Sequence, residues 1–192
     1  MHEQLFDPAA ILPGWARKFA EEKKGAVFNG DERMKLAIDL SRMNIRQGGG
    51  PFGAAVFQSE SGKLVSIGVN LVVQSNCSHA HAEMVAIAIA QHALSTYTLY
   101  REAETGYELA TSCEPCAMCF GAIIWSGVKK VVCGATTSDA VKAGFDEGPK
   151  PVLWARELEQ RGIAVETGLM RDEAQIVLEE YTRQGGFVYN AR

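Results

Sequence analysis

The first clear pattern along the chain is helical and covers residues 31–47. Apolar residues recur there every three or four positions and fall on one stripe: Met34, Ala37, Ile38 and Ile45. An Asn29 or Asp31 cap begins this predicted helix, and the triple glycine 48–50 ends it. The preceding residues, 1–29, contain two prolines and at most one short helix, which ends in the charged run 21–24. We expect these residues to form a separate extension of unknown role.

Short β-rich runs follow the first helix. Residues 52–58 and 63–70 are separated by Ser-Glu-Ser-Gly, which predicts an antiparallel hairpin. Further along, the pattern predicts strands at 107–112, 128–135 and 163–167, helices at 80–94, 115–126, 152–161 and 172–184, and a long loop at 136–151. Because strands and helices alternate after the hairpin, the predicted fold is α/β, a three-layer α/β/α domain around a mixed five-stranded sheet.

Two of the predicted helices, 80–94 and 115–126, are apolar on nearly every face, and each begins with a motif of metal-ligand residues. The first motif is His81-Ala82-Glu83, and the second is Pro115-Cys116-Ala117-Met118-Cys119. One neutral imidazole and two thiolates provide three ligands, and a catalytic zinc site keeps its fourth position for water. The first turn of a helix favours thiolate, because free N–H groups and the helix dipole are found there. We therefore predict zinc bound by His81, Cys116 and Cys119.

Glu83 lies two residues beyond the histidine and is not needed for coordination. A carboxylate beside an activated water can take its proton and pass it to a ring nitrogen and a leaving amine. A structural zinc site has no use for such a proton carrier. Glu83 therefore favours an enzyme over a non-catalytic, zinc-stabilised binding module.

Neighbouring residues allow other interpretations. The Cys-x-x-Cys pair alone is also compatible with a redox pair or with half of a structural zinc site. His79 competes with His81, but only His81 has a glutamate two residues later. Cys113 precedes the proline at the helix start, so we interpret it as a strand-end residue. Cys77 and Cys133 are expected to be small buried residues. Glu114 is either a helix-start carboxylate or a catalytic group.

Composition narrows the classes of partner. The chain has 192 residues, with 19 Lys and Arg against 23 Asp and Glu, and 47% hydrophobic residues, enough for the core of one domain. The slight acidity argues against nucleic acid as a partner. The longest apolar run, 116–125, is far short of the roughly 18 to 20 residues that span a bilayer. The acidic start of the chain, with Pro8, does not fit a signal peptide, so we expect a cytoplasmic location without a membrane segment.

Residues 31–190 resemble the cytidine deaminase-like superfamily. The pairing of His-x-Glu with Pro-Cys-x-x-Cys is its signature. Within that superfamily the chain is most similar to the bacterial guanine deaminases. This finer resemblance is carried by GGPFGAAV at 49–56, Asn70, TSCEPCAMC at 111–119, GV at 127–128 and above all GFDEGP at 144–149.

The resemblance implies the hydrolytic deamination of a free nucleobase, guanine to xanthine plus ammonia, with Glu83 as the proton shuttle. It makes Glu147 a second catalytic residue that faces the amine side of the base. A carboxylate matches the N–H donors of guanine at N1 and at the 2-amino group. Protons must also reach both N3 and the departing nitrogen, so a second glutamate can serve the leaving amine. The implied substrate-binding residues are Asn70, Phe52, Phe145, Ala82 and Tyr189.

For the domain organisation, we predict one zinc-dependent deaminase domain over residues 30–192. Members of this branch tend to be dimers, so the resemblance also implies a homodimer. The tail, 185–192, contains two aromatic residues and begins with two glycines. It is expected near an active site, and the sequence leaves open whether that site is its own or a partner's.

Other substrates remain open at this stage. Cytosine or an aminotriazine fits the same zinc chemistry, which does not select the ring. A tRNA adenosine deaminase shares both motifs but needs a basic groove for a flipped nucleotide. The expected loop 136–151 instead carries Asp139, Asp146 and Glu147, which would repel phosphate.

Overall fold

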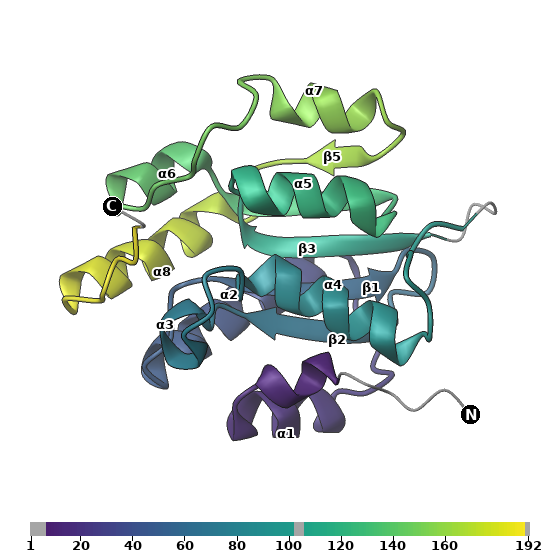
Figure 1. Cartoon of the computed structure of the whole chain (residues 1–192), viewed down its shortest axis with the longest axis horizontal. Helices are drawn as coiled ribbons and strands as arrows, with labels where there is room; N and C mark the ends of the chain where they lie inside the picture. Colours follow the sequence, from purple (N-terminus) through teal and green to yellow (C-terminus); the bar gives the residue numbers. More distant parts are fainter. Residues whose placement is uncertain (1–6, 102–105, 191–192) are drawn as a thin grey trace.

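The protein is described by a computed structural model in which residues 7–101 and 106–190 are placed. A five-stranded sheet with the order β2-β1-β3-β4-β5 forms its centre (Figure 1). The strands are β1 Gly53–Gln58, β2 Leu64–Val69, β3 Tyr107–Cys113, β4 Lys130–Ala135 and β5 Ala164–Glu166. Strand β1 pairs antiparallel with β2 and β3, whereas β3, β4 and β5 are parallel. The predicted mixed five-stranded sheet is confirmed.

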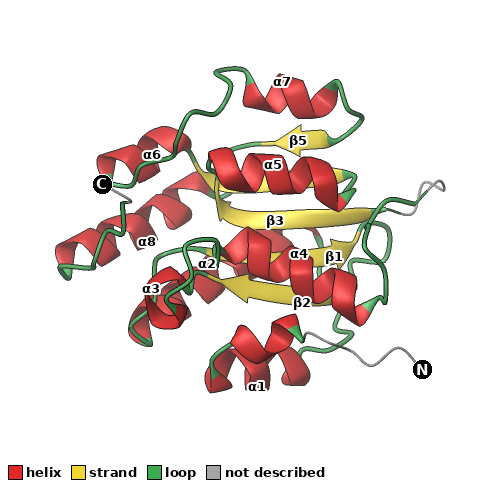
Figure 2. Ribbon diagram, in the orientation of Figure 1, coloured by secondary structure: helices red, strands yellow, loops and turns green. Residues whose placement is uncertain are grey.

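Strand β1 shows how the sheet divides the core into two layers. Ala55 and Phe57 lie in one hydrophobic cluster with helices α2 and α8, whereas Ala54 and Val56 lie in the other with α4, α5 and α7. Successive side chains of a strand point to opposite faces, so this alternation places helices on both faces (Figure 2). These helices are α2 Gly30–Arg46, α4 Ala82–Ala93, α5 Ala117–Ser126, α7 Trp154–Glu159 and α8 Arg171–Arg183.

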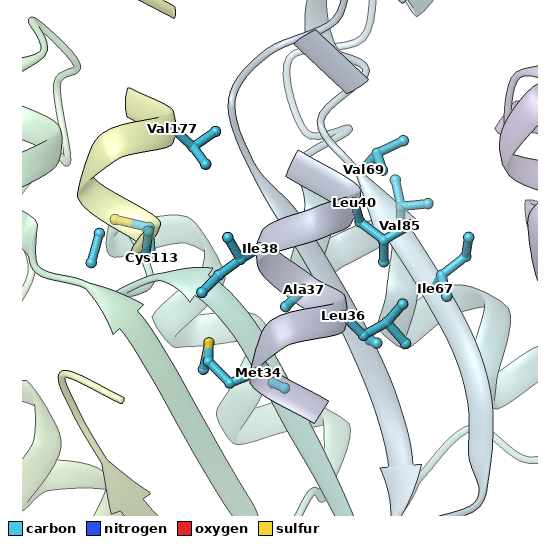
Figure 3. Packing of buried hydrophobic residues seen from close by; sticks show 14 of the residues in the cluster. Met34, Leu36, Ala37, Ile38, Leu40, Ile67, Val69, Val85, Cys113 and Val177 are labelled. Carbon is cyan, nitrogen blue, oxygen red and sulfur yellow. The ribbon is translucent and has the colours of Figure 1, made fainter. Parts of the chain in front are cut away.

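Helix α2 follows its predicted pattern closely. It begins with a capping box in which Asn29 accepts from the N–H of Glu32 and the Glu32 side chain accepts from the N–H of Asn29. Met34 and Ala37 are fully buried against the sheet (Figure 3), whereas Ile45 near the end of the helix is only half-buried.

The amino-terminal extension packs on the free edge of the sheet. It contains the 3₁₀ helix η1 Pro8–Ile11 and helix α1 Gly14–Glu22, the short helix expected before the charged run. Leu12 and Ala16 are buried in the main core. The N–H of Leu64 in edge strand β2 donates to the carbonyl oxygen of Ala26 at 2.9 Å. The extension therefore covers a strand edge that would otherwise offer unpaired backbone groups.

The structure differs from the predicted elements in two helix starts near the ligands and in two helices that were not predicted. Helices α4 and α5 begin at Ala82 and Ala117, so His81 and Cys116 are their N-caps and Pro115 lies outside the helix. The predicted loop 136–151 contains a helix, α6 Thr137–Lys142, because Thr136 and Asp139 form a capping box there. A short helix after β2, α3 Val72–Ser75, was also not predicted.

Strand direction brings distant segments to one edge of the sheet. Strands β2, β3 and β4 end at this edge, and β1, which runs the opposite way, begins there. Phe52 before β1, Asn70 after β2 and Glu114 after β3 are therefore neighbours, together with the segment that follows β4. No helix in the described part of the chain is long and apolar enough to cross a membrane.

Candidate active site

Two helix starts place three metal-ligand side chains together. His81 is the N-cap of α4, Cys116 is the N-cap of α5, and Cys119 lies in the first turn of α5. The Nδ1 atom of His81 is 3.5 Å from Sγ of Cys116 and 3.6 Å from Sγ of Cys119. Ligand atoms at ordinary zinc distances in a tetrahedron are roughly 3.6 Å apart, so the spacing fits a zinc ion. Among the described residues, this is the only group of three or more such ligands.

The electrostatics of the cluster also suit a metal cation. The neighbouring Cys119 thiol and His81 ring lower the pKa of Cys116 to about 4, so a thiolate is available. The Cys116 side chain and burial raise the pKa of Cys119, and burial raises that of Cys113, so it is position and not pKa that separates Cys113 from the ligands. Cys113 ends β3, as predicted, and its Sγ lies 3.7 Å from the carbonyl oxygen of Thr136. His79 lies outside the cluster and is exposed, with its ring 3.4 Å from Sγ of Cys77.

A cavity of about 390 Å³ opens beside the cluster, within the usual size of small-molecule sites. Eight of the predicted site residues line it: Phe52, Asn70, His81, Glu83, Cys116, Phe145, Glu147 and Tyr189. Tyr189 belongs to the tail, so the tail lies over the site of its own chain. Cys119 is fully buried behind the lining. Ala82 does not line the cavity, because its side chain is fully buried in the core.

Glu83 lies in the first turn of α4, and only 6% of its surface is exposed. Burial, and then the negative charge of Cys116, raise the pKa of its carboxyl group. A carboxyl group shifted in this direction keeps its proton to a higher pH than an ordinary glutamate, which suits a group that takes up and releases protons. Glu83 thus combines access to the cavity with the properties of a proton carrier.

Glu147 reaches the cavity from the loop between α6 and α7. Its main-chain carbonyl oxygen accepts the N–H of Ala117 at 2.8 Å, which ties it to the first residue of α5. Its side-chain atom Oε2 is buried and has no hydrogen-bond partner among the described residues. Burial, and then the charge of Cys116, raise the pKa of Glu147 to about 8. A buried carboxyl oxygen without a partner marks a position where a ligand can supply the missing donor.

Aromatic residues form the wall opposite the metal ligands. The rings of Phe52 and Phe145 are 4.9 Å apart in an edge-to-face arrangement, and Tyr189 is 5.7 Å from Phe145 and 5.9 Å from the His81 ring. The amide nitrogen of Asn70 donates to the hydroxyl oxygen of Tyr189. A planar aromatic ligand fits such a wall, and the Asn70 amide offers a donor and an acceptor at its edge.

Sequence reasoning missed the support behind Asn70. Asn44, fully buried in α2, donates from its amide nitrogen to the carbonyl oxygens of Gly50 and Asn70. A Cβ at Gly49 would overlap the Asn44 amide group, so the glycines let the chain wrap around this side chain. One feature of the sequence could have identified Asn44: it is a polar residue among the apolar positions of a helix, shortly before three glycines.

Comparison with known proteins is consistent with this site. Residues 29–135 match the family described as the cytidine and deoxycytidylate deaminase zinc-binding region. A guanine deaminase of Bacillus subtilis is 41% identical over 121 residues, which cover 62% of this chain and 73% of that protein. A tRNA-specific adenosine deaminase of Buchnera aphidicola is 30% identical over 154 residues, or 80% of this chain and 94% of that protein.

Solved structures agree over almost the whole chain. A guanine deaminase from Nitrosomonas europaea is 43% identical, with a TM-score of 0.86 over 95% of this chain and 99% of that one. A structure in complex with 2,6-diaminopurine is 47% identical, with a TM-score of 0.86 over 94% of this chain and 95% of that one. The chain belongs to the cytidine and deoxycytidylate deaminase family. The matched zinc-binding region contains all three residues of the cluster, and its cofactor is zinc.

Proposed function

We propose that this chain catalyses the zinc-dependent hydrolysis of guanine to xanthine and ammonia. The observation that carries the proposal is the buried Oε2 of Glu147, without a partner among the described residues, in the cavity that the metal ligands His81 and Cys116 also line. Two bacterial proteins, 41% and 43% identical in sequence to this chain, are guanine deaminases.

Substrate recognition follows from the polar groups of the cavity. Guanine presents N–H donors at N1 and at its 2-amino group, and the Glu147 carboxylate is an acceptor for both. Asn70 offers its amide to the opposite edge of the ring. Phe52 and Phe145 provide apolar contact for the plane of the base, whereas Ala82, which does not line the cavity, is left out of this proposal.

His81, Cys116 and Cys119 would hold zinc, which lowers the pKa of a coordinated water when it is bound. Glu83 then takes a proton from the attacking water and gives it to N3 of guanine while a C–O bond forms at C2. Cleavage of the C2–N bond requires a second proton on the departing nitrogen. The hydroxyl group formed on C2 loses its proton as it becomes a carbonyl group of xanthine, and Glu147, which faces the amine and has a pKa raised to about 8, takes that proton and passes it to the departing nitrogen. Guanine and water thus become xanthine and ammonia, with no oxidant or reductant.

The test is a substrate panel with the zinc-loaded protein. Ammonia release is measured with guanine, cytosine, an aminotriazine, adenine and a tRNA as separate substrates. We expect the highest kcat/KM with guanine. A higher kcat/KM with cytosine or an aminotriazine would contradict guanine as the substrate, while zinc-dependent deamination would stand as the reaction. Preference for tRNA would contradict the proposed substrate, because the tail residues Tyr189 and Asn190 and the acidic Asp146 line the cavity.

We further propose that a second copy of the chain covers helix α5. The helix is apolar on nearly every face, yet only Cys119, Ile123 and Ser126 are buried. Trp125 is 85% exposed, and Met118, also exposed, lines the mouth of the substrate cavity. A second copy on this face would border the active site. Light scattering should give the mass of a dimer for the wild type and of a monomer for Trp125→Glu. A monomeric wild type would contradict the proposal.

We also propose a cytoplasmic location. Both thiol ligands must stay reduced to bind metal, and all five cysteines of the chain are free. A reducing compartment satisfies that requirement. Detection of the protein in the oxidising extracellular fraction of its cells would contradict this location.

A further inference from the structure

Lys150 joins three segments next to the active site. Its Nζ atom donates to the carbonyl oxygen of Pro115 and to Oγ1 of Thr137, both at 2.6 Å. The same ammonium lies over the ring of Trp154, 4.8 Å from its centroid. Lys150 therefore connects the segment before α5, the start of α6 and the start of α7.

The charge of Lys150 is balanced through Thr137. The hydroxyl group of Thr137 accepts from Lys150 and donates to Oε2 of Glu114 at 2.7 Å, and the N–H of Thr137 donates to the same oxygen at 2.9 Å. The Thr137 hydroxyl is half-buried and lies between a cation and a carboxylate. The charges at both ends strengthen its hydrogen bonds to Lys150 and to Glu114. Glu114, which the sequence left as either a helix-start carboxylate or a catalytic group, has a partner of its own outside the metal cluster.

Lys150 follows Glu147 by three residues in the same loop. The Glu147 carbonyl oxygen is bonded to the N–H of Ala117, and the Lys150 ammonium to the carbonyl oxygen of Pro115. Both anchors thus attach the loop to the residues on either side of Cys116. Between them, Gly148 has a φ of +68°, a conformation that strains most side chains, and its N–H donates to Asp146. The loop is held at both ends of a tight turn.

We propose that Lys150 is a positioning residue for the reaction, which acts by fixing the loop that carries Glu147 against the start of α5. The inference rests on the proposed function of Glu147. The hydrogen bonds and the ring contact found for the Lys150 ammonium all go to Pro115, Thr137 and Trp154, so it holds Glu147 in place through the loop, while its positive charge also lowers the pKa of Glu147. Loss of the ammonium removes the side-chain anchor that follows Glu147 in the loop, and the Glu147 carboxylate is then held less firmly in one place.

The experiment is a double-mutant cycle with Lys150→Met and Glu147→Gln. Zinc content and kcat/KM for guanine are measured for both single variants and for the double variant. We expect Lys150→Met to keep zinc and to lower kcat/KM at least about fivefold in the wild-type background. In the Glu147→Gln background the same change should cost less than about twofold, because the group that it positions is already impaired. A residue with a purely structural role would reduce both backgrounds equally.

Matched variants keep the test decisive. Lys142→Met, at an exposed lysine of the neighbouring α6, should leave kcat/KM unchanged. Thr137→Val removes the bridging hydroxyl and should reproduce the effect of Lys150→Met, whereas Thr137→Ser keeps the hydroxyl and should restore activity. If Lys150→Met does not fold, the Thr137 pair is used in its place in the same cycle.

The outcomes separate the two proposals. If Glu147→Gln lowers activity and the losses from the two changes multiply, the positioning role of Lys150 is wrong while the role of Glu147 stands. If Glu147→Gln has full activity, the role of Glu147 in the reaction is wrong, and the positioning role falls with it.

Discussion

The amide nitrogen of Asn44 lies 2.7 Å from the main-chain carbonyl oxygen of Asn70 and donates to it across 26 residues of chain. The same amide holds the carbonyl oxygen of Gly50 at 2.9 Å. Helix α2 thereby fixes both the segment that leads to Phe52 and the residue proposed to bind the edge of the base. A fully buried amide in the core layer thus determines where two walls of the cavity lie.

This relationship predicts a specific effect of a small substitution. In Gly50→Ala the added Cβ would lie 2.7 Å from Oδ1 of Asn70, which must then move. We expect an increase in KM for guanine of about fivefold or more, the scale for one displaced hydrogen-bonding group. The control is Gly14→Ala, because nothing lies within 4 Å of a Cβ at Gly14. Equal KM values for the two variants would contradict the prediction.

Metal content distinguishes the predicted ligands from the third cysteine of the series. Cys116→Ala removes a thiolate of the cluster and should lose most of the zinc. Cys113→Ala should keep it, because Cys113 is buried at the end of β3 and is not part of the cluster. Elemental analysis of the purified proteins measures the difference, and equal zinc retention in the two variants would reject the ligand assignment.

Glu83→Gln tests the first proton carrier. The amide keeps the size of the side chain but cannot carry the proton, so zinc and guanine should still bind while kcat falls at least about 10²-fold. Binding is measured by calorimetry and turnover by ammonia release. A variant with near wild-type kcat would rule out the shuttle role.

Glu147→Gln tests the second carboxyl group. Gln places a donor where guanine also has donors, and one unpaired group in a closed site costs about 1 to 3 kcal/mol, or roughly 5- to 150-fold in kcat/KM. The loss is larger if Glu147 also supplies the proton to the amine, and we expect more than about tenfold. Zinc should remain bound. The comparison is made with guanine, cytosine and adenine, and full guanine activity in the variant would contradict the assignment.

Stability in acid should depend on Asp139. Its buried carboxylate is 2.8 Å from the guanidinium of Arg171 and closes the capping box of α6; Arg171, and then Thr136, hold its pKa well below the ordinary value. Because the folded pKa lies below the unfolded one, the ionised group stabilises the fold at pH values above about 4, and this contribution is lost as the pH falls through the folded pKa. Asp139→Asn should lower Tm at pH 7 by about 2 to 4 °C, and the difference should shrink below pH 4. A constant difference across this range would contradict the prediction.

The sequence alone was sufficient for the elements whose causes are local. The apolar stripe of α2 and its Asn29 cap, the two β-rich runs of the hairpin and the two apolar helices are set by residues close to one another along the chain. The ligand motifs belong to this group, because each consists of neighbouring residues at a helix start. Helix α6 was missed although Thr136 and Asp139 carry a local capping signal, since the glycines and prolines that follow favour a loop.

By itself, the sequence determined the order of the strands and of the longer helices, the three metal ligands as a set, and Glu83 beside them. Only the tertiary structure decided that Asn44 supports Asn70, that Tyr189 lies over the cavity of its own chain, and that Lys150 joins Pro115 to Thr137. The physical reason is distance along the chain. Hydrogen bonds between residues 26, 35 or 119 positions apart depend on how the sheet orders its strands, and no periodicity or spacing encodes that order locally.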